Sequence, residues 1–367
     1  MAFAIEAVEL RRVAMPLVAP FRASFGTESV RDVLLVRVMT AAAEGWGECV
    51  ARAEPLYSPE FVDAAVLVTR DHLLPRLWAA EEPGDVARLL QPVKGHPMAK
   101  GAVELAVLDA WLRAQDIPLS RYLGGERARV DVGVSVGIAS SVDELVGTVS
   151  GYVESGYRRV KLKIEPGWDV EPVAAVRARF PDLLLQVDGN GAYTLADTAV
   201  FAALDGFRLL LIEQPFGDDD LTAHATLARR MSTPICLDES VTSAARAAEA
   251  IDRGACSIVN IKAGRVGGYL EAKAVHDVCL ERRVPVWCGG MLETGIGRAA
   301  NVALATLPGF TYPADLSASD RYFTADLTPP FVLEDSQLAV PPGPGIGVEP
   351  LPEHLDRFTT WVEVLRP

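Results

Sequence analysis

Arg159-Val-Lys-Leu-Lys-Ile164 opens a stretch in which short apolar runs recur at an almost constant interval. The four runs that follow are Leu183-Leu-Leu-Gln-Val-Asp188, Leu209-Leu-Leu-Ile-Glu213, Pro234-Ile-Cys-Leu-Asp238 and Ser257-Ile-Val-Asn-Ile-Lys262. At or next to its end, each run carries one charged residue: Lys163, Asp188, Glu213, Asp238 and Lys262, spaced by 25, 25, 25 and 24 residues. These runs have the length and composition of buried strands.

Helical patterns fill the intervals between the runs, as in 170–180 and 244–253. A strand followed by a helix, repeated about every 25 residues, predicts a closed ring of parallel strands. In such a barrel the chemistry lies at the carboxyl ends of the strands. We therefore expect the five charged residues to face one site.

Three carboxylates on consecutive strands, Asp188, Glu213 and Asp238, would then converge between two lysines. Like charges at close range cannot all remain ionised without compensation. A hard divalent cation with oxygen ligands resolves this conflict, and Mg²⁺ is the usual ion for carboxylate sites. The alternative is that these residues are unrelated charges, solvated where strands meet loops.

The composition excludes several partners and compartments. The chain has 367 residues, half of them hydrophobic, and a formal net charge of −14, which would repel nucleic acid and anionic membranes. Its start, with Glu6 and no long apolar core, does not resemble a signal peptide, and no apolar run has the length of a membrane span. Five cysteines without CxxC spacing are expected to be reduced core residues of a cytoplasmic protein.

Residues 1–125 lack the 25-residue rhythm and predict a separate α+β unit. Its strands are expected at Val8–Val13, at Val33–Val38 and from Trp46, and its helices over Ser58–His72 and Met98–Arg113. Two segments are expected to be loops with aromatic side chains, Ala19–Phe25 and Ala51–Tyr57. Such aromatic residues either fill the core of their own domain or form a lid over a pocket.

The barrel is expected to occupy residues 126–325. It begins with the strand Val130–Val136 and ends with the strand Pro285–Gly290 and an irregular eighth strand near Thr311–Ser317. Residues 326–367 lose the rhythm again and form a tail that returns to the first unit.

The lysines suggest a reaction. Lys161 and Lys163 alternate along a strand and share a face, so each ammonium disfavours protonation of the other. A lysine base needs a pKa near the working pH, well below its ordinary value of about 10.4. Arg265, three residues after Lys262, is a cationic neighbour that could act on Lys262 in the same way. Two such lysines could remove a proton beside a metal-bound carboxylate on one face and return it on the other, through an enediolate. For Lys161 and Lys163 the alternative is a solvated strand end.

The motifs at the strand ends resemble those of the enolase superfamily, in its muconate-lactonizing-enzyme subgroup. They are Lys161-x-Lys163, Asp188-Gly-Asn190, Glu213-Gln-Pro215, Asp238-Glu-Ser240 and Lys262-Ala-Gly-Arg265. Longer matches resemble the o-succinylbenzoate synthases that also racemise N-acylamino acids: 20–26, 45–49, 161–172, 260–269 and 287–295. The resemblance covers essentially the whole chain.

This resemblance implies an α/β fold, a (β/α)7β barrel with an α+β capping domain built from the N-terminal region and the C-terminal tail. It implies Mg²⁺, or Mn²⁺, held by Asp188, Glu213 and Asp238, with Lys163 and Lys262 as the acid/base pair and no organic cofactor. It also implies a small carboxylate substrate and either dehydration to o-succinylbenzoate or racemisation of N-acylamino acids. The expected assembly is a homo-oligomer that binds neither nucleic acid nor membranes.

Further residues are candidates for supporting or substrate-binding roles. Those expected beside the metal and the lysines are Lys161, Asn190, Glu239 and Arg265. Those expected to contact the substrate are Phe21, Phe25, Arg52, Tyr57, Ser135, Gly290, Met291, Leu292 and Glu293, and Glu293 is also a candidate partner for the metal or lysines. Arg52 either faces the pocket, where it would pair with a succinyl carboxylate, or faces solvent and has no role.

Three alternatives to this function remain at the level of sequence. A dipeptide epimerase of the same superfamily would need an Asp-x-Asp pair near the eighth strand, where this chain has Asp315-Leu316-Ser317. A muconate cycloisomerase would present the same metal and lysine set. From another class, a barrel that binds a ligand without turnover would show binding of an N-acylamino acid but no isotope exchange.

Overall fold

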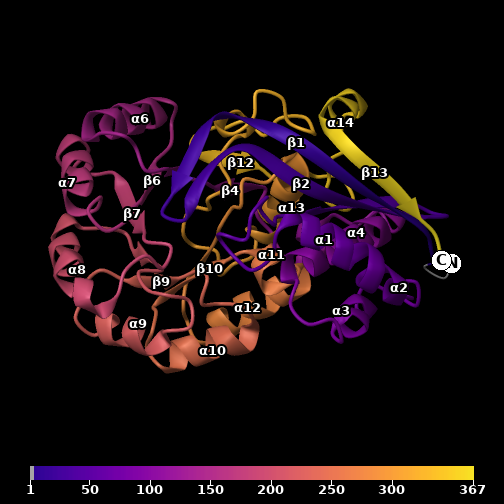
Figure 1. Cartoon of the computed structure of the whole chain (residues 1–367), viewed down its shortest axis with the longest axis horizontal. Helices are drawn as coiled ribbons and strands as arrows, with labels where there is room; N and C mark the ends of the chain where they lie inside the picture. Colours follow the sequence, from indigo (N-terminus) through magenta and orange to yellow (C-terminus); the bar gives the residue numbers. More distant parts are fainter. Residues whose placement is uncertain (1–3) are drawn as a thin grey trace.

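The computed structural model describes residues 4–367 and places a curled parallel sheet beside a twisted antiparallel sheet (Figure 1). The first three residues of the predicted 1–125 unit, including the start of the segment compared with a signal peptide, lie outside the described residues. No helix within residues 4–367 is long and apolar enough to cross a membrane.

The parallel sheet is built from the repeated apolar runs. Its seven strands are ordered β11-β10-β9-β8-β7-β6-β5. They are β5 (Val134–Val136), β6 (Arg159–Lys163), β7 (Leu184–Asp188), β8 (Ile212–Glu213), β9 (Ile235–Leu237), β10 (Ile258–Ile261) and β11 (Val286–Cys288). Apart from Leu184, every residue in them is buried, as expected for parallel strands covered on both faces. The predicted α/β barrel architecture is confirmed.

Helices follow the strands of this sheet, and those between residues 142 and 252 lie in an arc outside it (Figure 1). The helices are α6 (Val142–Glu154), α7 (Val170–Arg179), α8 (Thr198–Leu204), α9 (Leu221–Ala228), α10 (Ala244–Asp252), α11 (Ala263–Val266), α12 (Tyr269–Glu281) and α13 (Gly295–Leu304). Several begin at a side chain that accepts a hydrogen bond from the first turn, for example Ser141 from Glu144 N and Ser243 from Arg246 N. Such capping residues are why the loops after the strands turn into helices where they do.

The two edges of the parallel sheet are joined by the segment 309–315. Val286 N donates to Gly309 O at 3.1 Å and Asp315 N to Cys288 O at 2.8 Å, while Gly133 N donates to Ala314 O at 2.8 Å on the other side. This is the predicted irregular eighth strand. It makes only isolated bridges, and no regular strand is formed there.

The single strand predicted for Val130–Val136 is wrong, because the structure divides it. β4 (Arg129–Asp131) pairs antiparallel with β12 (Gln337–Ala339), and β5 then joins the parallel sheet. Gly133 lies at the break, where a Cβ atom would stand 2.3 Å from Arg159 Nε. The chain changes its pairing partner at this glycine, from β12 before it to β6 after it, so the two strands are separate.

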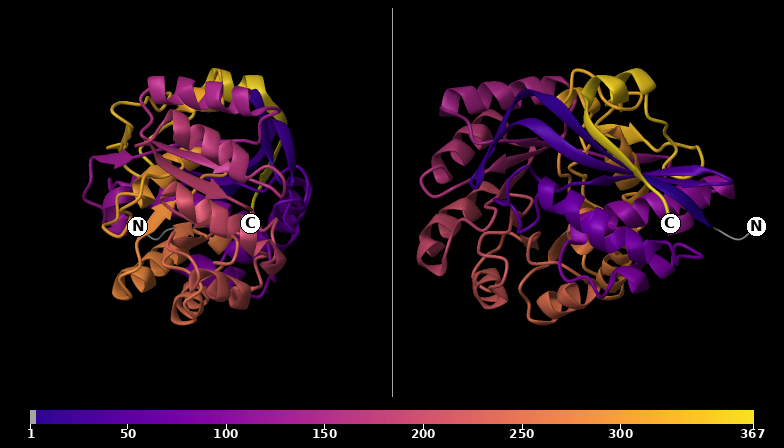
Figure 2. Two further views of the ribbon diagram at one scale, coloured as in Figure 1. Left: turned by 90° about the vertical axis from the view of Figure 1, so that its left-hand side faces the viewer. Right: turned by 45° about the vertical axis from the view of Figure 1, so that its right-hand side comes forward.

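The antiparallel sheet has the order β13-β1-β2-β3 and lies across the parallel sheet (Figures 1 and 2). Its strands are β1 (Ile5–Ala23), β2 (Gly26–Thr40), β3 (Glu44–Cys49) and β13 (Thr359–Leu365). The end of the chain thus returns to the N-terminal sheet, after the helix α14 (Pro352–Phe358).

The predicted loop Ala19–Phe25 is also wrong. It is the tip of the β1–β2 hairpin, where Phe21 pairs with Glu28 and Ala23 with Gly26. The pairing register shifts between Pro16 and Phe21, a stretch with two prolines that cannot donate a ladder hydrogen bond. The interruption made this part of a 19-residue strand look like a loop.

The helices of the N-terminal region are α1 (Val62–Val68), the π-helical turn η1 (Thr69–Leu73), α2 (Leu74–Leu77), α3 (Asp85–Leu90), α4 (Pro97–Ala114) and α5 (Leu119–Leu123). Of these, α1 and α4 pack on the antiparallel sheet, α3 packs on α4, and α5 contacts α13. The helix predicted from Ser58 therefore begins four residues later, and the strand predicted over 209–213 is reduced to two residues. All five cysteines are free and buried, as expected.

Helix α4 approaches β3 so closely that two glycines are required there. Ala102, Ala106 and Ala110, at four-residue spacing, form a narrow stripe of small side chains against the strand. A Cβ atom on Gly47 would lie 1.9 Å from Ala102 O, and one on Gly45 would lie 2.1 Å from Ala110 N. The contact is backbone against backbone, so no side chain can move aside.

We expect Gly47→Ala to lower the free energy of unfolding by about 3 kcal/mol, because the strand and α4 must separate. Gly151→Ala is the matched control, since that glycine lies within α6 and its added Cβ meets nothing within 4 Å. There the alanine should stabilise by about 0.5 to 1 kcal/mol. Urea unfolding of both variants measures the difference, and an unchanged midpoint for Gly47→Ala would contradict this packing.

Candidate active site

Five charged side chains lie where the parallel strands end. Lys163, Asp188 and Glu213 are the last residues of β6, β7 and β8, and neighbouring strands pair in register at these positions. Asp238 and Lys262 directly follow β9 and β10. The three carboxylates are fully buried and the two lysines are at most 8% exposed. The structure therefore brings the five residues to one end of the sheet.

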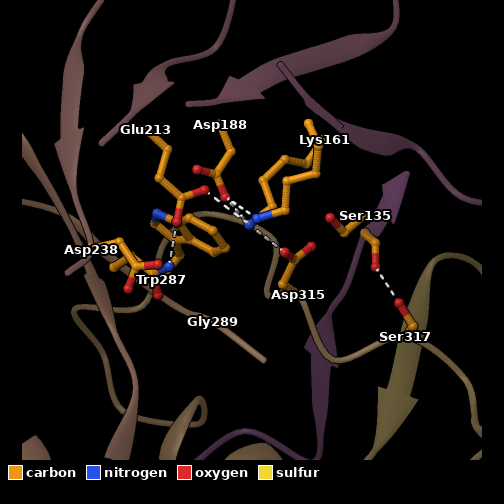
Figure 3. A network of polar contacts seen from close by, with 12 residues as sticks. Ser135, Lys161, Asp188, Glu213, Asp238, Trp287, Gly289, Asp315 and Ser317 are labelled. Carbon is orange, nitrogen blue, oxygen red and sulfur yellow. Dashed lines mark hydrogen bonds and ion pairs between the residues drawn. The ribbon is translucent and has the colours of Figure 1, made fainter. Parts of the chain in front are cut away.

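Lys161 lies at the centre of the carboxylates (Figure 3). Its Nζ is 2.9 Å from Glu213 Oε2, 2.7 Å from Asp315 Oδ2 and 3.3 Å from Asp188 Oδ2. It also lies 4.9 Å from the centre of the Trp287 ring, as Figure 3 illustrates. Although burial disfavours the charged amine, these carboxylates raise its pKa well above the ordinary value. Lys161 is therefore a permanent cation.

The surroundings of Lys163 lower its pKa. Its Nζ contacts Asp188 Oδ2 at 2.5 Å and Asn190 Oδ1 at 2.7 Å. Burial lowers the pKa of Lys163, and the Lys161 ammonium lowers it further against the opposing effect of Asp188. This agrees with the expected effect of the Lys161 ammonium on Lys163, but the converse does not hold, because the carboxylates around Lys161 raise its pKa.

Lys262 differs from Lys163 because its pKa is raised, and Arg265 is not among the main causes of that shift. Its Nζ contacts Asp238 Oδ2 at 2.7 Å and Tyr57 Oη at 3.1 Å. Burial alone would lower the pKa of Lys262, but Tyr57, Glu239 and the strand-end carboxylates raise it. The Arg265 guanidinium instead pairs with the other oxygen of Asp238 and donates to Val241 O at 2.9 Å.

The oxygen donors at the strand ends fit a hard cation. In residues 4–367 no three Asp, Glu, His or Cys side chains already stand as a metal cluster, because ammonium and guanidinium groups pair with the carboxylates instead. Two further buried oxygens, Glu239 Oε2 and Asn260 Oδ1, have no hydrogen-bond partner. Carboxylate and amide oxygens are the ligands that Mg²⁺ prefers, so the set suits a divalent cation that would compete with the lysines.

A small cavity of about 30 Å³ lies beside these lysines, which is room for about one water molecule. Its lining includes most of the predicted substrate-binding residues: Phe21, Phe25, Arg52, Tyr57, Ser135, Gly290, Met291 and Leu292. Lys161, Lys163, Lys262, Asn190, Asp315 and Tyr322 complete it. Ser135 Oγ is buried without a partner.

Glu293 does not line this cavity. Its carboxylate accepts hydrogen bonds from Met291 N at 2.9 Å and from Asn301 Nδ2 at 3.0 Å, so it holds the loop after β11 in place. The structure therefore gives Glu293 contacts within the loop and none with the cavity.

Three residues of the site were not selected from the sequence: Asp315, Asn260 and Tyr322, which lines the cavity. Asp315 binds Lys161 and also Arg159, at 2.6 Å. Asn260 donates from Nδ2 to Glu213 Oε1 at 2.6 Å. Asn260 precedes Lys262 by two residues and so shares its strand face, as Lys161 does with Lys163. That alternation was a usable signal for Asn260, whereas Asp315 lies in a segment without strand periodicity.

Comparison with known proteins agrees with this architecture. Residues 5–124 match the mandelate racemase / muconate lactonizing enzyme N-terminal domain, and residues 144–354 match the enolase C-terminal domain-like family. The chain is 61% identical to an N-succinylamino acid racemase from Amycolatopsis sp, over 98% of this chain and 99% of that protein. It is 45% identical to an o-succinylbenzoate synthase from Geobacillus kaustophilus, over 99% and 98% of the two chains.

Among solved structures, a member of the enolase superfamily from Listeria innocua superposes with a TM-score of 0.94 at 38% identity, covering 99% of each chain. Both family models and these full-length similarities agree with the strand-end motifs. The chain belongs to the enolase superfamily, in its mandelate racemase / muconate lactonizing enzyme branch.

Proposed function

We propose that this chain abstracts the α-proton of N-succinylamino acids and racemises them, and that the same site dehydrates the precursor of o-succinylbenzoate. The observation that carries this proposal is the pair of buried lysines, Lys163 and Lys262, that reach one cavity from β6 and from the end of β10. The two most relevant relatives, at 61% and 45% identity, are named for these two reactions.

Asp188, Glu213 and Asp238 would hold the divalent cation. When bound, Mg²⁺ would supply positive charge that stabilises the negative charge developing on the substrate carboxylate. Lys161, kept protonated by its three carboxylate neighbours, would add a second fixed positive charge at the same end of the sheet. Both effects lower the cost of removing a proton from the adjacent carbon.

In racemisation the two lysines would act from opposite faces of the α-carbon. One neutral amine takes the α-proton, and the other, as an ammonium, delivers a proton to the opposite face. Asn190 and Tyr57 orient the two amines through the hydrogen bonds described above. In the reverse direction the two lysines exchange roles.

In the dehydration, Lys163 would take the α-proton and then return it to the departing β-hydroxyl group, which leaves as water. Lys262, which carries its charge more firmly, would remain a cation and stabilise the negative charge on the substrate. The unequal environments of the two lysines suit this division of roles.

The site disfavours the dipeptide epimerase alternative. Asp315 is already paired with Arg159 and Lys161, and Ser317, where the second acid of that motif would stand, donates to Gly133 O at 3.0 Å. No pair of free carboxylates is left in this segment to bind a substrate amino group.

The proposal predicts that the purified protein with Mg²⁺ exchanges the α-proton of both enantiomers of an N-succinylamino acid for deuterium in D₂O. Proton NMR follows the loss of the α-proton signal, and polarimetry follows inversion. The two rates show whether a lysine exchanges its proton with solvent before inversion. If it does, the α-proton signal should be lost faster than the optical rotation. Binding of the compound without any exchange would instead support a ligand-binding barrel without turnover.

A further inference from the structure

Two arginines and one glutamate form a cluster near the tip of the β1–β2 hairpin, in which Arg31 is fully buried and the other two side chains are partly buried. Glu28 lies in β2, and both Arg31 and Arg52 pair with its carboxylate, Arg31 at 3.4 Å. Arg31 is fully buried and also donates to Ala51 O and Val50 O at 2.9 and 2.8 Å. Within residues 4–367, Glu28 is the sole carboxylate that forms an ion pair with either arginine. The cluster therefore carries one positive charge in excess.

Arg52 is the member of this cluster that lines the cavity beside the lysines. It lines the small cavity beside the lysines and also an outer cavity of about 320 Å³ under the hairpin tip. Phe21 and Phe25 are likewise shared by both cavities. Arg52 Nε is buried and has no hydrogen-bond partner. A buried guanidinium with a free donor is costly unless an acceptor is supplied.

Aromatic rings fix the position of this guanidinium. Its Cζ lies 5.1 Å from the centre of the Phe25 ring and 5.9 Å from that of Tyr57. Lys262 Nζ lies 5.0 Å from the centre of the same Tyr57 ring. The guanidinium and the amine are therefore separated by no more than the sum of these two distances. A four-carbon acyl chain, with carbon–carbon bonds of about 1.5 Å, can span this interval between its contacts.

We propose that Arg52 binds the terminal carboxylate of the substrate's acyl group and thereby selects dicarboxylic acyl chains over neutral ones. This inference rests on the proposed function, since it places the α-carbon beside Lys262. The acyl chain would run past Tyr57 toward the outer cavity, where its carboxylate meets Arg52. An ionised, partly desolvated pair of this kind is among the strong hydrogen-bonded contacts in proteins.

Glu28 is the internal competitor for this contact. It pairs with the Arg52 guanidinium, and the Arg52 side chain also lines both cavities. Without a ligand it partly neutralises the two arginines and keeps the cluster stable. Removing its charge should therefore make Arg52 a better partner for a substrate carboxylate.

The test compares two N-acyl derivatives of one amino acid that differ only at the chain end: succinyl, with a carboxylate, and succinamoyl, with a neutral carboxamide of the same shape. Deuterium exchange at the α-carbon gives kcat/KM for each, and calorimetry gives each Kd. In Arg52→Met the ratio of the two kcat/KM values should fall about 10- to 100-fold, mainly through KM for the succinyl compound. Arg52→Lys should restore part of the ratio.

Arg22→Met is the matched control, because Arg22 lies on the same hairpin and pairs with Glu165 at 2.9 Å without lining either cavity. Its ratio should equal that of the unmodified protein. In Glu28→Gln the succinyl preference should rise. An unchanged ratio in Arg52→Met, or a preference lowered by Glu28→Gln, would overturn the inference. Calorimetry separates the two proposals. If the Kd values show a succinyl preference that depends on Arg52 but no deuterium exchange occurs, the proposed reaction is contradicted and the role of Arg52 is not.

Discussion

Lys163→Ala and Lys262→Ala should each abolish racemisation of an N-succinylamino acid, with kcat/KM falling by about 10³- to 10⁴-fold, as expected for loss of a general acid or base. The two variants should differ in exchange. Each retains one amine, so each should still exchange the α-proton of one enantiomer without inverting it, and the enantiomer should be opposite in the two variants. Proton NMR in D₂O, started from each pure enantiomer, measures this pattern.

Both alanine variants are expected to fold, because each leaves the neighbouring carboxylate with another cationic partner. Without Lys163, Asp188 still lies 3.3 Å from Lys161 Nζ, and without Lys262, Asp238 still pairs with Arg265. Neither carboxylate is left buried without a counter-charge. Lys273→Ala is the control, since Lys273 pairs with Asp277 on the outside of α12, at 2.6 Å. Equal racemisation in all three variants would refute the two-lysine assignment.

Removal of divalent cations should have the second large effect. Treatment with a chelator should lower kcat/KM for exchange by about 10³-fold or more, because a bound cation contributes several kcal/mol to stabilising the developing charge. Added Mg²⁺ should restore activity. Glu213→Gln should weaken Mg²⁺ binding in calorimetry, because one of three anionic ligands becomes neutral while the shape is kept.

Asp277→Asn provides the carboxylate control for this measurement, as its side chain is half exposed on α12 and far from the strand ends in sequence and fold. It should bind Mg²⁺ as the unmodified protein does. Exchange that persists in the chelated protein, or Mg²⁺ affinity that is equal in Glu213→Gln and the unmodified protein, would rule out the proposed ligand set.

Much of the barrel could be predicted because buried parallel strands leave a simple pattern. Each strand is rich in apolar residues and buried on both faces, and the charged residue at its carboxyl end marks where the site begins. The same logic fails where strands are irregular. Val130–Val136 alternates apolar with polar or small residues as a single strand would, yet it is divided where the chain leaves β12 and joins the parallel sheet, and that change of partner depends on residues distant in sequence.

In the candidate site, too, some residues could be predicted from the sequence and others could not. The strand-end lysines and carboxylates followed from spacing, because consecutive strands of a barrel place equivalent positions side by side. Asp315 could not be found this way, since the segment that carries it lacks regular pairing. The orientation of Arg52 was also open from sequence, because it depends on Glu28 of the hairpin and on two aromatic rings that the fold brings around it.

The pairing of β13 with β1 has a consequence for biosynthesis. β1 precedes every barrel strand in the chain and β13 follows them all, so one edge of β1 stays unpaired until the barrel strands have been translated. An unpaired strand edge invites association with other nascent chains. Completion of the antiparallel sheet is therefore a late event that follows synthesis of the barrel strands, and chaperone demand should peak just before it.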